Sequence, residues 1–289
     1  MKNTLLPGIR QSVKVFFSRG VVVIIATAII VAFLFVAILA PIIAPYDPYE
    51  MHYDDPFAKP SGKYLLGTDN FGRDLLSRII YGARITLIVS LLASTIAALI
   101  GILLGMIAGY CGGIVSEVIM RICDAQLSIP TLIFAMVLAF FINSNGNLAS
   151  VAFIIGISMV PNYVRVVHGT TLSLKESDYV TASKQLGKKD FSILIRHILP
   201  NCFPSIIVIF TMNLGSAILM EANMSFLGVG ITAPTPAWGC MVSTGYKYLI
   251  TAPSVAIIPG IAVILIVVAF NIVGDSLRDS LDPKLKGKI

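Results

Sequence analysis

The stretch Asp178–Asn201, DYVTASKQLGKKDFSILIRHILPN, carries a dense group of charged residues between two long apolar runs. The charged residues are Asp178, Lys184, Lys188, Lys189, Asp190 and Arg196. Charged side chains are costly inside a bilayer. We therefore expect this stretch to lie in water at a membrane surface, as a loop with structure of its own.

Two short helices joined by a glycine turn are predicted within this loop. Asp178 can act as the N-cap of a first helix of about two turns, and Gly187 stands where a helix ends in a left-handed residue. Asp190 can cap a second helix, Phe191–Ile198, which Pro200 would close. Because isolated helices this short are marginal in water, we expect the pair to dock on a soluble partner.

Three parts of the loop are in register with the EAA loop of permease subunits from ATP-driven, binding-protein-dependent importers. That motif reads Glu-Ala-Ala, three residues, Gly, nine residues, Ile-x-Leu-Pro, and the matching parts are Thr181-Ala182-Ser183, Gly187 and His197-Ile198-Leu199-Pro200. The departures from the motif are Thr181, Ser183 and His197, but DYV, LG and RHILPN resemble the peptide and nickel branch. Tyr64–Leu87 resembles the C-type permease subunit of that branch, and Ser225–Gly239 also resembles this branch.

The resemblance implies an all-α membrane protein with the six transmembrane helices of the type I ABC importer permease (MetI-like) fold. It also implies a cytoplasmic coupling helix, which in that family seats in a groove of a cytoplasmic ATPase. The residues that match this role are Tyr179, Thr181, Ala182, Ser183, Gly187 and Pro200.

The same resemblance implies partners, a location and a substrate class. The partners are a second, homologous permease subunit, two cytoplasmic ATPase subunits that bind ATP and Mg²⁺, and an extracytoplasmic substrate-binding protein. The location is the plasma (inner) membrane of a bacterium or archaeon, with contact to membrane lipid. The implied substrates are short peptides, nickel, or a metal chelate such as a metallophore.

The composition is that of an integral membrane protein. Hydrophobic residues make up 56% of the chain and charged residues 12%, against roughly 25% charged in a soluble domain. The formal charge is +6, but the basic residues cluster at the ends of apolar runs, so membrane topology explains them better than nucleic acid. The four cysteines lack metal-ligand spacing and are expected to be small packing residues.

Six apolar spans are predicted, with both termini in the cytoplasm because lysines and arginines precede the first span and end the chain. The spans are Val21–Ile43, which Pro41 should end, Ile85–Gly109, a segment through Pro130 to Ile142, Leu148–Val164, Cys202–Leu227 and Leu249–Gly274. Asn143–Asn147 is expected to be an outer turn. The predicted division is a cytoplasmic segment 1–20, a first helix 21–43, an extracytoplasmic loop 44–84, a five-helix core 85–275 containing the coupling loop 165–201, and a cytoplasmic tail 276–289.

Several smaller features carry structural predictions. Gly101, Gly105 and Gly109 have the small-xxx-small spacing that lets two helices approach closely. Arg73–Tyr81 is expected to be an interfacial helix after a polar turn, with no catalytic role for Asp69 or Asp74. We also expect an ion pair between Arg121 and Asp124, and Trp238 at a membrane interface.

Glu221 lies inside the fifth predicted span, near Asn213. A carboxylate at membrane depth usually faces a cavity or a polar partner. Glu221 and Asn213 are therefore candidates for a translocation path or gate. A structural carboxylate with satisfied hydrogen bonds is an equally good interpretation of Glu221.

The chain has none of the motifs that an enzyme would need. There is no GxxxxGK[ST] loop for nucleotide phosphates, no HExxH helix for zinc and no GxSxG nucleophile elbow. We therefore expect no cofactor in this chain, no metal site, and ATP hydrolysis by partner subunits only. The alternative function is a secondary-active membrane transporter, which would typically be longer and carry inverted repeats.

Overall fold

A computed structural model describes residues 20–142 and 146–281. Within these ranges the chain is almost entirely helical and has no strand. The helices are α2 (Val21–Ile43), α3 (Leu75–Cys111), α4 (Gly113–Leu127), α5 (Thr131–Ile142), α6 (Leu148–Lys175), α7 (Asp178–Gln185), α8 (Asp190–Ile193), the π-helix Leu194–Ile198, α9 (Leu199–Phe226), α10 (Trp238–Tyr246) and α11 (Ser254–Leu281). The predictions for the N-terminal segment and most of the C-terminal tail fall outside the described residues, as does most of the outer turn at 143–147.

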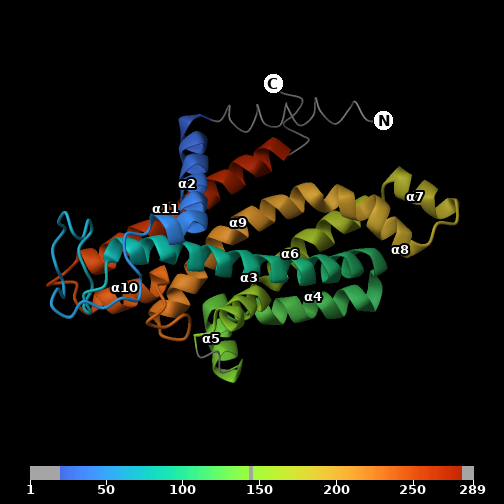
Figure 1. Cartoon of the computed structure of the whole chain (residues 1–289). Helices are drawn as coiled ribbons and strands as arrows, with labels where there is room; N and C mark the ends of the chain where they lie inside the picture. Colours follow the sequence, from blue (N-terminus) through green and yellow to red (C-terminus); the bar gives the residue numbers. More distant parts are fainter. Residues whose placement is uncertain (1–19, 143–145, 282–289) are drawn as a thin grey trace.

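Five of these helical runs are long and apolar enough to cross a membrane, and α4 with α5 adds a sixth if the pair is one bent span. The two members of this pair meet at 94° across Pro130. Figure 1 shows α3, α6 and α9 running side by side, with α7 and α8 at one end. The loop before α3 and helix α10 lie at the opposite end. The all-α prediction with up to six spans is confirmed.

The closest packing joins α3 to α6 along the predicted glycine seam. A Cβ on Gly105 would come within 2.8 Å of Val167 Cβ, and one on Gly109 within 2.7 Å of Thr171 Cβ. Gly101 lies in the same way against Tyr163. The prediction that these glycines serve helix packing is confirmed.

Several helices are longer than their predicted spans. Helix α3 begins at Leu75, where Asp74 accepts the Ser77 N–H at 2.8 Å, so the expected interfacial helix Arg73–Tyr81 is not a separate element. Helix α2 ends at Ile43 as predicted, but Pro41 lies within it and does not break it. Helix α6 continues beyond Val164 to Lys175, so the first part of the expected coupling loop is helical.

Helix α6 passes through Pro161 because another helix satisfies the carbonyl group that this proline leaves free. A proline cannot donate to the carbonyl four residues earlier, which here belongs to Ile157. Gln126 of α4 donates its side-chain N–H to that oxygen at 3.0 Å. Such replacement bonds are what allow prolines inside membrane helices.

The predicted ion pair between Arg121 and Asp124 was wrong. Asp124 pairs with Arg165 of α6 at 2.7 Å, whereas Arg121 lies 3.8 Å from Glu117 on its own helix. Trp238 is fully buried within the protein, and its expected position at a membrane interface stays a prediction. Its Nε1–H donates to the Ile79 carbonyl of α3 at 3.0 Å.

Asp69 and Asp74 have structural roles, as expected. The carboxylate of Asp69 lies 2.7 Å from Arg73 Nε and 3.5 Å from Arg78 Nε, and all three side chains are buried. Arg78 also donates to the Pro48 carbonyl at 2.8 Å. This cluster holds the loop before α3 against the end of the bundle that carries α10 (Figure 1).

The seam between α3 and α6 provides the first prediction. Gly105→Val should lower the free energy of unfolding by about 1–3 kcal/mol, because the added side chain overpacks the contact with Val167. The matched control is Gly169→Val on α6, where a Cβ meets nothing within 4 Å. Thermal unfolding of the two detergent-solubilised variants measures the difference, and equal melting temperatures would contradict the assigned packing.

Candidate functional site

The charged stretch between α6 and α9 forms a two-helix projection, which we call the knuckle (residues 178–201). Its first helix, α7, begins at Asp178, and its N-cap is Ser177 without a side-chain hydrogen bond. The predicted N-cap at Asp178 was therefore wrong by one residue. Its carboxylate lies in the first helical turn, where the helix dipole favours a negative charge.

Gly187 makes the turn between the two arms of the knuckle, as predicted. Its φ is +75°, in the left-handed region. The Gly187 N–H donates to the Lys184 carbonyl at 2.9 Å, and the Lys188 N–H donates to the Ser183 carbonyl at 3.2 Å. This pair of bonds is the Schellman motif, which ends a helix on a left-handed residue.

The second arm differs from its prediction at both ends. Helix α8 begins at Asp190 with Lys189 as N-cap, so Asp190 does not cap it. Pro200 does not close the helix either, because it lies in the first turn of α9. The preceding π-helix bonds the Leu199 N–H to the Leu194 carbonyl, and Pro200 then occupies a turn position where its missing N–H is tolerated.

The knuckle is attached to the bundle by an apolar base. Val180, Ile193 and Ile198 are fully buried against Val167 of α6 and Tyr110 of α3. Polar contacts add to this base. The Tyr110 hydroxyl donates to Asp190, and Lys184 Nζ lies 4.8 Å from the centre of the Tyr110 ring.

The opposite side of the knuckle is exposed and partly apolar. Leu186 is 79% exposed and Phe191 is 75% exposed, one on each side of the Gly187 turn. Sequence reasoning missed both residues, although two large apolar side chains in a charged loop were a usable signal. Of the predicted coupling residues, the structure exposes Tyr179, Thr181, Ala182, Gly187 and Pro200, and it buries Ser183.

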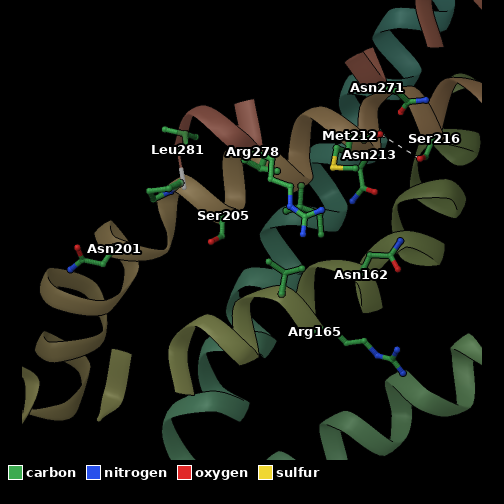
Figure 2. A pocket seen from close by; sticks show the side chains of 14 residues that line it. Asn162, Arg165, Asn201, Ser205, Met212, Asn213, Ser216, Asn271, Arg278 and Leu281 are labelled. Atoms are coloured by element: carbon green, nitrogen blue, oxygen red, sulfur yellow. Dashed lines mark hydrogen bonds between the residues drawn. The ribbon is translucent and has the colours of Figure 1, made fainter. Parts of the chain in front are cut away.

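A second candidate site is a cavity of about 820 Å³ between α6, α9 and α11. Figure 2 shows its polar side chains coming from all three helices. They include Asn162, Arg165, Asn213, Ser216, Asn271 and Arg278. Asn213 was a predicted path residue and does line this cavity. The others were missed, because nothing local in the sequence shows which faces of three distant helices come together.

Glu221 does not line this cavity. It is fully buried, and its carboxylate accepts from Ser225 Oγ at 2.8 Å and from Thr86 Oγ1 at 3.3 Å. Ser225 Oγ in turn accepts the Ile231 N–H at 2.9 Å. These contacts join α9 to α3 and to the outer loop, which favours the structural interpretation of Glu221 over a gate.

A bundle of membrane-spanning helices with a polar cavity and a surface projection is typical of one class of protein, the helical subunits of membrane transporters. Residues 101–287 match the family described as binding-protein-dependent transport system inner membrane component. Residues 15–60 match the N-terminal transmembrane domain of oligopeptide transport permease C. This chain therefore belongs to the binding-protein-dependent transport system inner membrane component family.

Curated relatives extend this match over almost the whole chain. The glutathione transport system permease protein GsiD of Shigella flexneri serotype 5b is 41% identical over 272 residues, which cover 94% of this chain and 89% of the relative. GsiD of Escherichia coli O157:H7 is 40% identical over the same coverage. The chain is thus a permease subunit of an ABC importer, and the alternative of a secondary-active transporter is set aside.

Solved structures show the same fold at lower identity. Two crystal forms of the MetNI methionine ABC transporter, in inward facing conformations, give TM-scores of 0.59 and 0.56 with 18% and 19% identity. The first covers 72% of this chain and 98% of the compared chain. The type I importer permease fold predicted from the sequence is confirmed.

The turn at Gly187 yields a prediction for the knuckle. Gly187→Val should cost about 1 kcal/mol or more locally, because a Cβ disfavours the left-handed conformation. No neighbouring atom lies within 4 Å of that Cβ, so backbone conformation is the only cause. Hydrogen exchange of the α7 amides should become faster in Gly187→Val than in the control Gly187→Asn, since Asn tolerates this conformation. Unchanged exchange in both variants would contradict the assigned turn.

The contacts of Glu221 yield another prediction. Glu221→Ala leaves two buried hydroxyl groups without their acceptor, at a cost of about 1–3 kcal/mol. It should therefore lower the yield of assembled protein and leave uptake per assembled complex unchanged. Glu221→Gln keeps an acceptor oxygen and should assemble well. If Glu221→Gln assembled normally but abolished uptake, the charge itself would be needed, and that result would support a role of Glu221 in the translocation path.

Proposed function

We propose that this permease subunit forms half of a translocation path and receives ATP-driven motion through the knuckle. The observation that carries the proposal is the knuckle itself, with its buried base and its exposed apolar side. The base ties any movement of the projection to α3 and α6. The exposed side offers Leu186 and Phe191 to a partner surface.

The proposed partner at the knuckle is a cytoplasmic ATPase subunit, which holds the ATP and Mg²⁺ that this chain has no motif to bind. An apolar groove with polar edges would suit Leu186, Phe191 and the surrounding lysines. Two such subunits would serve this chain and a second, homologous permease subunit. With the knuckle on the cytoplasmic side, both termini lie in the cytoplasm and α10 faces a substrate-binding protein outside.

The path is proposed to run along the cavity between α6, α9 and α11. Asn162, Ser216 and Asn271 are exposed side chains on helices that are otherwise apolar enough to span a membrane. Exposed amides and hydroxyls at membrane depth are costly against lipid and usually face water or protein. This face is therefore the one we assign to the path and to the second permease subunit.

The proposed cargo is a short peptide. The relatives that match this chain over most of their length are glutathione permeases, and glutathione is a tripeptide with two carboxylates. Nickel or a metal chelate is the competing cargo implied by the wider branch. Uptake of labelled glutathione, an unrelated tripeptide and Ni²⁺ by the reconstituted transporter separates these possibilities.

Removing the apolar side of the knuckle tests the coupling assignment. The double variant Leu186→Glu, Phe191→Glu should lose ATPase co-purification and ATP-dependent uptake, because two charges replace the apolar contact. The control for ATPase co-purification is Ile250→Glu, an exposed apolar residue in the turn that follows α10, far from the knuckle. Both proteins should insert in the membrane equally well. Normal ATPase binding and uptake in the double variant would remove the knuckle from the coupling mechanism.

A further inference from the structure

The chemistry of the cavity indicates which cargo it accepts. Its lining contains two arginines and several amides and hydroxyls, and no aspartate or glutamate among the residues that form it. Asn162, Ser216 and Asn271 come from exposed faces of α6, α9 and α11, and Asn213 is buried. A cavity with cationic donors and no lining carboxylate is suited to an anion and unsuited to a bare metal cation.

The two arginines differ in how far they are already neutralised. Arg165 lies 2.7 Å from Asp124 of α4, so that pair carries little net charge. Arg278 of α11 has no ion-pair partner within the described part of the chain. Figure 2 shows its side chain extending from α11 into the space between α9 and α6. Among the described residues, the arginine of the cavity lining without a carboxylate partner is therefore Arg278, whose planar guanidinium matches a carboxylate.

The spacing of polar residues along α11 sets a size for the anion. Asn271 and Arg278 are seven residues apart, which places them on the same face of the helix about 10.5 Å from one another at 1.5 Å per residue. An extended peptide advances by about 3.3–3.6 Å per residue. A tripeptide can thus place a carboxylate at Arg278 while its other end reaches Asn271 and Ser216.

We propose that Arg278, with Asn271 and Ser216, forms a binding site for the carboxylate of a short acidic peptide on the inner half of the path. The proposal deepens the proposed function and rests on it. It assigns the cargo to anionic peptides and against uncomplexed divalent cations. Arg278 is a specificity-determining residue, because a charge-assisted bond to it is about twice as strong as a neutral one.

Protection of an engineered thiol in the cavity tests the site directly. Cys111 is exposed, whereas the other three cysteines are buried. A Cys111→Ser, Ser205→Cys chain therefore carries one accessible thiol, placed in the cavity lining. The assembled transporter is placed in inside-out phosphatidylcholine vesicles, and the rate of reaction with an impermeant maleimide is measured without nucleotide.

The probes are the tripeptide Ala-Glu-Glu, its neutral counterpart Ala-Gln-Gln-amide, and Ni²⁺. Ala-Glu-Glu at ten times its Kd should slow labelling about tenfold, because only about one site in ten is then unoccupied. The neutral peptide and Ni²⁺ should not slow it. Protection should be lost in Arg278→Gln and only partly kept in Arg278→Lys, which keeps the charge but lacks the planar fork. The matched control Arg121→Gln, which removes an exposed arginine of α4 outside the cavity, should keep full protection.

Three results would overturn the site. The first is equal protection by Ala-Glu-Glu and Ala-Gln-Gln-amide, and the second is protection that survives Arg278→Gln. The third is slow labelling in vesicles containing phosphatidylglycerol without any peptide, which would assign Arg278 to a lipid headgroup. ATP-dependent uptake with the binding protein is measured on the same preparation. Uptake without protection would contradict only the proposed binding site, whereas absence of ATP-dependent uptake would contradict the proposed function.

Discussion

The contact between α3 and α6 is the constraint on which the other parts depend. Lipid tails are as apolar as leucine side chains, so membrane helices associate through close packing and not through burial from water. Gly101, Gly105 and Gly109 supply this packing, because each leaves room for one side chain of α6. Through that seam α6 is fixed in place, and it carries both the base of the knuckle and one wall of the cavity.

Local chemistry explains which features could be predicted from the sequence. The bounds of α2 follow from an uninterrupted apolar run, and the turn at Gly187 follows from the one residue type that adopts the left-handed conformation freely. The prediction failed at Pro200 because a proline is tolerated in a first helical turn as well as after a last one. The continuity of α8, the π-helix and α9 depends on a hydrogen bond from the Leu199 N–H to the carbonyl five residues earlier. No residue pattern in the sequence predicts that bond.

The cavity could not be predicted because it depends on contacts between distant helices. Asn162, Asn271 and Arg278 are separate polar residues in the sequence, and only packing shows that they face one space. Asn213 was identified because it lies at membrane depth, where a polar side chain is unusual. The same reasoning selected Glu221. The sequence could not show whether that carboxylate faces a cavity or accepts hydrogen bonds from two hydroxyl groups, as it does in the structure.

Helix α8, the π-helix and α9 follow one another without a gap over Asp190–Phe226, a helical run of 37 residues. At 1.5 Å per residue it is about 55 Å long. One end carries Phe191 on the knuckle, and the other carries Ser225, which holds the loop at Ile231. Continuous helix therefore joins the knuckle to the loop at Ile231. A tilt of this run as a unit by about 5° at the knuckle would displace its far end by about 5 Å over that length. The π-helix and Pro204 are the points at which the run could bend instead.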